Sequence, residues 1–96
     1  MIVYLSGAIT SDPNHKVKFE AAKKEYENKG YQVLSPIETQ AYKTSQSNDE
    51  CLKEAINLLF DADILVELDN PEISEEMQIE LALADYWNII RIKSWE

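Results

Sequence analysis

Hydrophobic positions along the chain follow two patterns, short apolar runs and longer segments in which apolar residues recur at helical spacing. The runs rich in β-branched and aromatic residues have the length and composition of strands. They cover residues 2–6, 31–34, 62–68 and 89–92. The third run, ADILVEL, is apolar throughout, which is typical of a strand buried on both faces of a sheet.

The segment between the first two runs has the features of a helix. Ser11 or Asp12 is suited to cap it, and Pro13 suits its first turn. Gly30 follows the segment, where a left-handed residue is favoured. The apolar residues recur at helical spacing: Phe19, Ala22 and Tyr26. We therefore predict a first helix that ends just before Gly30.

Two further helices are expected, one before and one after the run at 62–68. The i, i+3, i+4, i+7 pattern of the second helix is formed by Leu52, Ala55, Ile56 and Leu59. The segment 74–87, SEEMQIELALADYW, forms the third helix, after a turn at Asp69, Asn70 and Pro71. Residues 36–49 are polar and long for a connection, and such a loop is often a lid or a binding element.

The alternation of strands and helices, βαβαβαβ, predicts an α/β domain with a parallel sheet and helices on both of its faces. Ligands of such sheets bind at the carboxyl ends of the strands. The loops that leave the first and third strands, SGAIT and LDNPEIS, are the first places to look for a site. The 96 residues suffice for a single domain, 1–96.

Glu80 occupies an unusual position in the third helix. On a helical wheel it falls near the centre of an apolar arc whose members are Ile73, Met77, Leu81, Leu83, Ala84 and Trp87. An ionised carboxylate in a core costs several kcal/mol unless it is paired or neutralised. Glu80 is either a structural carboxylate with a hidden partner or a nucleophile or general base beside the crevice. The central placement favours the functional interpretation.

Charge and composition narrow the class of protein. A formal charge of −9 argues against a nucleic-acid-binding surface, although it leaves room for a single nucleotide in a pocket. One cysteine, Cys51, excludes an internal disulfide and suits a reducing cytosol. Neither a signal peptide nor a stretch long enough for a membrane span is apparent. We expect a cytoplasmic protein that is not bound to a membrane.

Other candidate residues carry weaker signals. Tyr4 is either a core aromatic or a partner for Glu80, because a buried phenol needs a hydrogen-bond acceptor. Gly7 suits either a simple turn or close approach of a ligand to the backbone, and Ser74 is a plausible N-cap of the third helix. His15 and Cys51 stand alone in sequence, so no metal site and no thiol mechanism are expected.

Three motifs together resemble the nucleoside 2-deoxyribosyltransferases and the related deoxynucleoside monophosphate N-glycosidases. The segment YLSGAIT at residues 4–10 is similar to the first strand and loop of that family, Y-[LI]-[SA]-G-[PS]-I. The segment ADILV at 62–66 is similar to its third strand. Ser74 and Glu80, followed by LALA, are similar to its S-x-G-x-x-x-E-[LI]-x-x-A helix. The resemblance spans nearly the whole chain.

The resemblance implies roles for individual residues. Glu80 would be the nucleophile that attacks C1′ of a deoxyribose, and Tyr4 would lie beside it. Ser74 would contact a 5′-phosphate, and Asp69 is a looser candidate for contact with the sugar or base. The backbone cradle for the substrate would be formed by Ser6, Gly7 and Ala8. No cofactor is implied, and the partner is a small-molecule nucleoside or nucleotide.

The resemblance further implies a flavodoxin-like three-layer α/β/α fold with a four-stranded parallel sheet of order 2-1-3-4, and a homo-oligomer with its site across a subunit interface. Two positions depart from the family. Its helix glycine is Glu76 here, and the acidic residue of its second helix is Ala55. The expected function is cleavage or transfer at the N-glycosidic bond of a 2′-deoxynucleoside or its 5′-monophosphate. The alternative is a catalytically degenerate nucleotide-binding or protein-interaction domain.

Overall fold

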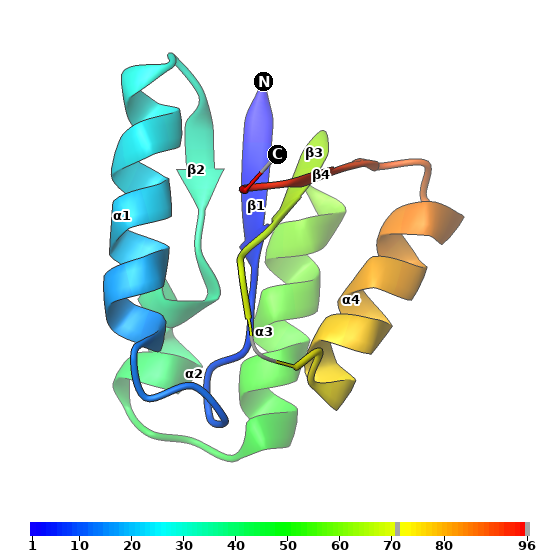
Figure 1. The fold of residues 1–96 in the computed structure, drawn as a ribbon. Coiled ribbons are helices and arrows are strands. Elements are labelled where there is room, and N and C mark those ends of the chain that lie inside the picture. The colour runs from blue at the N-terminus through cyan, green and yellow to red at the C-terminus, as the bar shows by residue number, and fades with distance from the viewer. Residues whose placement is uncertain (71, 96) are drawn as a thin grey trace.

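The computed structural model describes residues 1–70 and 72–95 of the chain. Its elements, in chain order, are β1 (Ile2–Ser6), α1 (His15–Asn28), β2 (Gln32–Leu34), the 3-10 turn η1 (Pro36–Glu38), α2 (Gln40–Lys43), α3 (Asn48–Phe60), β3 (Ile64–Glu67), α4 (Glu75–Tyr86) and β4 (Ile90–Lys93). Figure 1 labels the α-helices and the strands. The predicted alternation of strands and helices is therefore confirmed.

The four strands form one parallel sheet in the order β2-β1-β3-β4, as predicted. In the centre of this sheet, Tyr4 of β1 is paired with Leu34 on one side and Leu65 on the other. All four residues of β3 are buried, which agrees with its apolar sequence. Strand β4 forms an edge, and its four residues are exposed.

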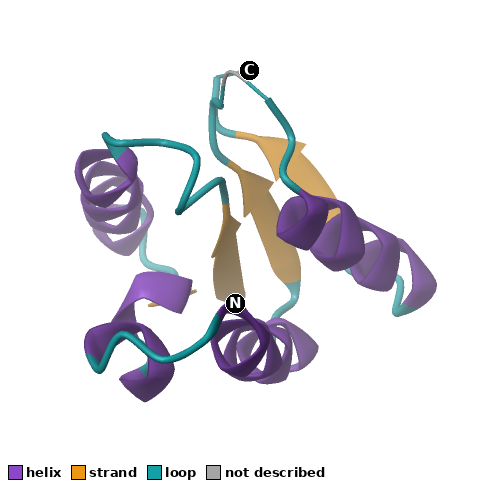
Figure 2. Cartoon of the chain, turned by 90° about the horizontal axis from the view of Figure 1, so that it is seen from below, coloured by secondary structure: helices purple, strands orange, loops and turns teal. Residues whose placement is uncertain are grey.

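Helices cover both faces of the sheet and make a three-layer α/β/α arrangement (Figure 2). One face packs against α1 through the residues Val3, Leu5, Phe19, Ala22, Tyr26, Val33, Ile64, Val66 and Leu68. The other face packs against α3 and α4 through Tyr4, Ala55, Leu59, Ala62, Leu65, Leu81, Ala84 and Ile89. Both layers exclude water from the central strands.

Strand β1 serves both layers because successive side chains of a strand point to opposite faces. Val3 and Leu5 belong to the α1 face, whereas Tyr4 belongs to the α3 and α4 face. Ser6 has the same parity as Tyr4 and also contacts α4. The polar side chains of β1 are therefore directed at the helix that carries Glu80.

Two local expectations were wrong. Helix α1 begins at His15 rather than at Pro13, and neither Ser11 nor Asp12 caps it. The carboxylate of Asp12 is instead bound to Lys18 and to the backbone N–H of Asn14. Residues 36–49 are not an irregular loop, since they contain η1, α2 and the first two residues of α3.

The ends of the other elements agree with the sequence pattern. Gly30 has a φ of +93°, which is the left-handed conformation expected after a helix. The hydroxyl of Ser74 accepts a hydrogen bond from the backbone N–H of Met77, as expected for an N-cap of α4. Ile73 lies outside this helix and is exposed, so its predicted place in the apolar arc was wrong. Pro71 of the predicted turn lies outside the described residues.

Within residues 1–70 and 72–95, none of the helices is both long enough and apolar enough to cross a membrane.

Candidate functional site

Glu80 is buried, with 4% of its surface exposed. Each of its carboxylate oxygens accepts a hydrogen bond from a side chain of β1. The Tyr4 hydroxyl donates to Oε2, and the Ser6 hydroxyl donates to Oε1 at 2.7 Å. Tyr4 and Ser6 are themselves fully buried. The structure thus brings three polar side chains together at the point where β1 ends, and two of them were expected to meet from sequence.

Burial raises the pKa of Glu80 to about 7. The hydrogen bonds from Tyr4 and Ser6 act in the opposite direction, because they stabilise the ionised carboxylate. The negative charge of Glu76 adds to the upward shift of this pKa. At neutral pH, Glu80 is therefore present in both its ionised and its protonated form. A carboxyl group in this state can act as a nucleophile, a base or an acid.

Tyr4 is held in its neutral form. Its burial, and then the neighbouring negative charge of Glu80, raise the pKa of its phenol well above the ordinary value. A neutral phenol beside a carboxylate is a hydrogen-bond donor. Tyr4 therefore fixes one oxygen of Glu80 by donation and does not compete with it for protons near neutral pH.

A cleft of about 530 Å³ opens beside Glu80. It lies at the carboxyl ends of the strands, where the topology predicted a site. Gly7 lines it from the end of β1, Ala55 from α3, and Ser74 and Glu76 from the start of α4. This volume falls within the range typical of small-molecule sites. The arrangement places a poised carboxyl group next to a space that a small molecule can occupy.

Residues 36–49 form another wall of the cleft, to which Pro36, Tyr42 and Lys43 contribute. This segment is anchored at two points. The backbone N–H of Ala41 donates to Glu54 of α3 at 2.9 Å, and the ring of Tyr42 stands edge-on to His15 of α1. Its contribution to the cleft agrees with the expected binding role, which itself stays a prediction.

The tautomer of neutral His15 follows from its contact with the backbone of Asp12. His15 Nδ1 lies 3.0 Å from the carbonyl oxygen of Asp12, and Nε2 lies 2.7 Å from the Tyr42 hydroxyl. A carbonyl only accepts hydrogen bonds, so Nδ1 carries the proton. In neutral His15, Nε2 therefore accepts from Tyr42. The side chain that looked solitary in sequence joins α1 to the wall of the cleft.

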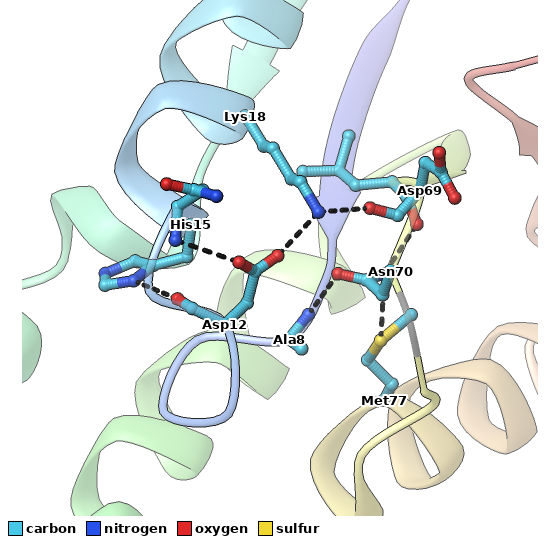
Figure 3. A network of polar contacts seen from close by, with 9 residues as sticks. Ala8, Asp12, His15, Lys18, Asp69, Asn70 and Met77 are labelled. Carbon is cyan, nitrogen blue, oxygen red and sulfur yellow. Dashed lines mark hydrogen bonds and ion pairs between the residues drawn. The ribbon is translucent and has the colours of Figure 1, made fainter.

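The loops after β1 and β3 are joined by a second polar network (Figure 3). Lys18 Nζ donates to the Asp12 carboxylate at 2.6 Å and to the backbone carbonyl of Asp69 at 2.8 Å. The side-chain oxygen of Asn70 accepts from the backbone N–H of Ala8 at 3.0 Å, while its amide nitrogen donates to Leu68 and contacts the Met77 sulfur. These contacts fix the two loops that flank Glu80.

Three of the expected substrate-binding residues lie elsewhere. Among the described residues that line the cleft, Ser6, Ala8 and Asp69 are absent. The side chain of Ser6 is bound to Glu80, and the N–H of Ala8 is taken by Asn70. Asp69 is exposed, and its carbonyl accepts from Lys18. Of the three residues of the predicted backbone cradle, Gly7 lines the cleft.

Gly7 is explained by packing as well as by its position at the cleft. A Cβ at this residue would lie 3.2 Å from two atoms of Leu68 and 3.3 Å from Phe19. These distances are tighter than ordinary contacts, so any larger residue would push against the α1 face. The glycine thus carries no independent indication of a ligand.

Ser74 and Glu76 line the cleft at the start of α4, and both are half-buried. The Ser74 oxygen is occupied as the N-cap acceptor for Met77, although its hydrogen stays available to a ligand. Glu76 brings a negative charge to the same wall.

Sequence reasoning missed Asn70 and the two lysines of the cleft, Lys16 and Lys43. Asn70 was noted only as a turn residue, and a short polar side chain directly after a buried strand was the available signal. The lysines were hidden among other surface lysines. In the part of the chain that the structure describes, no group of three His, Cys, Asp or Glu side chains is arranged to hold a metal ion.

The family model "Domain of unknown function (DUF4406)" matches residues 1–91. The chain belongs to the DUF4406 family. No curated protein matches the sequence. The match to the DUF4406 family includes β1 and α4, and therefore includes Tyr4, Ser6 and Glu80. The description of the DUF4406 family states no activity.

Proposed function

We propose that this domain cleaves or transfers the N-glycosidic bond of a 2′-deoxynucleoside or its 5′-monophosphate, with Glu80 as the nucleophile and Tyr4 as its orienting partner. The observation that carries the proposal is the buried Glu80 carboxylate, held by two hydroxyl groups beside an open cleft of about 530 Å³. The resemblance to the nucleoside 2-deoxyribosyltransferases supports the same residue.

The chemistry suits a carboxylate in this setting. Cleavage of an N-glycosidic bond passes through an oxocarbenium-like state, which an adjacent carboxylate stabilises by charge and by forming a glycosyl ester. The bond from C1′ to the base breaks as the bond from C1′ to a Glu80 oxygen forms, and the base leaves with the electron pair. Water or a second base then releases the sugar from Glu80. The leaving base takes up a proton, either from solvent or from a side chain that lines the cleft.

A second candidate function is supported by two lining residues. Glu76 places a charge on the α4 wall, and Ala55 leaves α3 without a carboxyl group in the cleft. Both positions depart from the catalytic motifs of the family that the sequence resembles. The second candidate is therefore a domain that binds a nucleotide without cleaving it, or that contacts another protein.

For either candidate function, we propose that the protein is cytoplasmic and forms a homo-oligomer.

Base release from the four common deoxynucleosides and their 5′-monophosphates tests the enzymatic proposal. We expect release by the natural chain and a loss of at least about a thousandfold in Glu80→Gln, which removes the nucleophile and keeps the size of the side chain. Glu75→Gln is the matched control, because Glu75 is an exposed carboxylate of the same helix. Its variant should release base at the natural rate.

Binding of the same compounds, followed by shifts in melting temperature, separates the two candidates. Shifts that persist in Glu80→Gln, without base release by any variant, would favour the binding domain. Base release that is undiminished in Glu80→Gln would contradict the role given to this residue.

A further inference from the structure

Two lysines that line the cleft have neither a carboxylate nor an aromatic partner among the described residues. The chain carries 18 acidic residues and nine lysines and arginines, so most cations have a carboxylate or aromatic neighbour. Lys18, Lys23, Lys53 and Arg91 form ion pairs, Lys29 lies over Tyr26, and Lys93 lies over Trp95. Among the described residues, the lysines without such a partner are Lys16, Lys24 and Lys43. Two of these three line the cleft.

The position of Lys16 is unfavourable for the helix that carries it. Lys16 is the second residue of α1, and the first turn of α1 contains no acidic residue. A cation at a helix N-terminus is opposed by the helix dipole, which prefers negative charge there. The stability of α1 therefore does not account for Lys16. The Asp12 carboxylate already accepts from the backbone N–H of Asn14 at this helix terminus, so it is the ammonium group of Lys16 that makes this wall of the cleft attractive to an anion.

Lys43 adds a second cation from a different element. It is the last residue of α2 and lies in the segment that Tyr42 and Ala41 anchor to His15 and Glu54. Because this segment is tied to α1 and α3, Lys43 is held near the cleft rather than on a free loop. The wall formed by α1 and α2 is thus positive at two independent points.

The α4 wall has the opposite character. Glu75 and Glu76 stand in the first turn of α4, and Glu76 lines the cleft. The Ser74 oxygen is the N-cap acceptor for Met77, which leaves a single O–H donor on this wall for an anion. The Glu76 carboxylate on this wall opposes the attraction that the helix dipole would have for an anion. A phosphate is therefore better placed at the α1 and α2 wall than beside Ser74.

We propose that Lys16 and Lys43 bind an anionic group, a phosphate monoester, of the ligand that occupies this cleft. The inference deepens the proposed function, and rests on it for the identity of the deoxynucleoside part of the ligand. It moves the anion site away from Ser74, where the sequence resemblance would put it. The site then discriminates phosphorylated from unphosphorylated ligands through charge.

Affinity measurements by calorimetry test this inference. The probes are 2′-deoxynucleosides, their 5′-monophosphates and 2-deoxyribose 5-phosphate. We expect the monophosphates to bind at least about tenfold more tightly than the nucleosides at low salt, a gap that narrows as salt screens the lysines. Each of Lys16→Gln and Lys43→Gln should weaken monophosphate binding by about five- to tenfold and leave nucleoside binding unchanged.

The matched control is Lys24→Gln, because Lys24 is an exposed lysine of α1 that does not line the cleft. Its variant changes the net charge by the same amount and should keep the affinity of the natural chain. Lys16→Arg should also retain most of the affinity, since it keeps the charge. Unchanged melting temperatures of the unliganded variants would show that the fold is intact.

Several results would overturn the inference. These are equal affinity for nucleosides and monophosphates, absence of binding by any probe, affinity that survives both lysine substitutions, or an equal loss in Lys24→Gln. Lysine-dependent binding of 2-deoxyribose 5-phosphate without base release from any nucleotide would support the phosphate site and contradict the proposed reaction. The two proposals can therefore fail separately.

Discussion

The two faces of the sheet differ in what they bury, although one strand supplies both. On the α1 face, Val3 and Leu5 of β1 pack into a cluster of aliphatic and aromatic residues, in which, among the described residues, Tyr26 has the only polar side-chain atom. On the opposite face, Tyr4 and Ser6 of the same strand surround the carboxylate of Glu80. The α1 face has the composition expected of a layer that only stabilises the fold. The α4 face contains a buried carboxylate that an apolar residue would replace at lower cost.

This difference is the reason, independent of any relative, for choosing the α4 face as the candidate functional side of the molecule. Buried polar groups are retained where they are paired and where they serve a purpose beyond packing. The three side chains of the α4 face are paired with one another and lie beside the cleft. Substitutions on the two faces should therefore change the free energy of unfolding by different amounts. Above all, these changes should differ in how they depend on pH.

The largest effect on the free energy of unfolding is expected from a substitution on the α1 face. Phe19 is 1% exposed, and Phe19→Ala should lower the free energy of unfolding by about 3–5 kcal/mol, because it removes buried apolar surface and leaves a cavity. Urea unfolding at pH 5 and pH 8 should give the same loss. Val17→Ala, at an exposed position of the same helix, should change stability by less than about 0.5 kcal/mol. A loss that depends strongly on pH would break the comparison.

The second-largest effect on the free energy of unfolding is expected from Glu80, and it varies with pH. Its folded-state pKa of about 7 lies above the ordinary value of 4.5, so the folded protein binds this proton more tightly than the unfolded chain. The cost of ionising it is absent below pH 4.5, grows between pH 4.5 and 7, and is complete above pH 7. It amounts to about 3 kcal/mol, so stability should fall by that amount as pH rises through this window.

Glu80→Gln should remove this slope, and unfolding free energies of both proteins at several pH values provide the measurement. Asp12 acts in another range and with opposite sign. Its hydrogen bond from Lys18 lowers the pKa of its carboxyl below 3.8, so its contribution is lost only as pH falls below that value. An equally steep slope between pH 4.5 and 7 in Glu80→Gln would show that another group is responsible.

The smallest effect is expected from a pair of serines at the carboxyl ends of neighbouring strands. Ser6 donates to Glu80, and Ser6→Ala should cost about 1.5–3 kcal/mol at pH 8, where the acceptor is ionised. The Ser35 oxygen is buried and has no hydrogen-bond partner among the described residues. Ser35→Ala should therefore be neutral or stabilising by up to about 1 kcal/mol. Equal losses in the two variants would contradict the assignment of Ser6.

Much of the fold followed from the sequence because its signals are local. The strands were marked by β-branched runs, and the burial of Glu80 followed from the helical period of α4. Ser6 was expected only in a backbone cradle, although the alternation of side chains along β1 places it on the same face as Tyr4. These features need no long-range contact to be recognised.

The features that sequence reasoning missed depend on tertiary contacts. Helix α2 has only four residues, too few to form alone, and is anchored through Ala41 to Glu54 and through Tyr42 to His15. The backbone carbonyl of Asp69 accepts from Lys18, 51 residues earlier in the chain, a contact that the sequence did not indicate. Contacts between segments so far apart have no signature in local composition.

The state of the Glu80 carboxyl group is the central claim of this account. Its side chain can be followed directly by ¹³C NMR of the carboxyl carbon, with Glu80→Gln used to assign the signal. We expect a titration midpoint at about pH 7 in the natural chain, and a higher midpoint in Ser6→Ala, because that variant loses a hydrogen bond that stabilises the ionised form. A midpoint at or below pH 4.5 would contradict it.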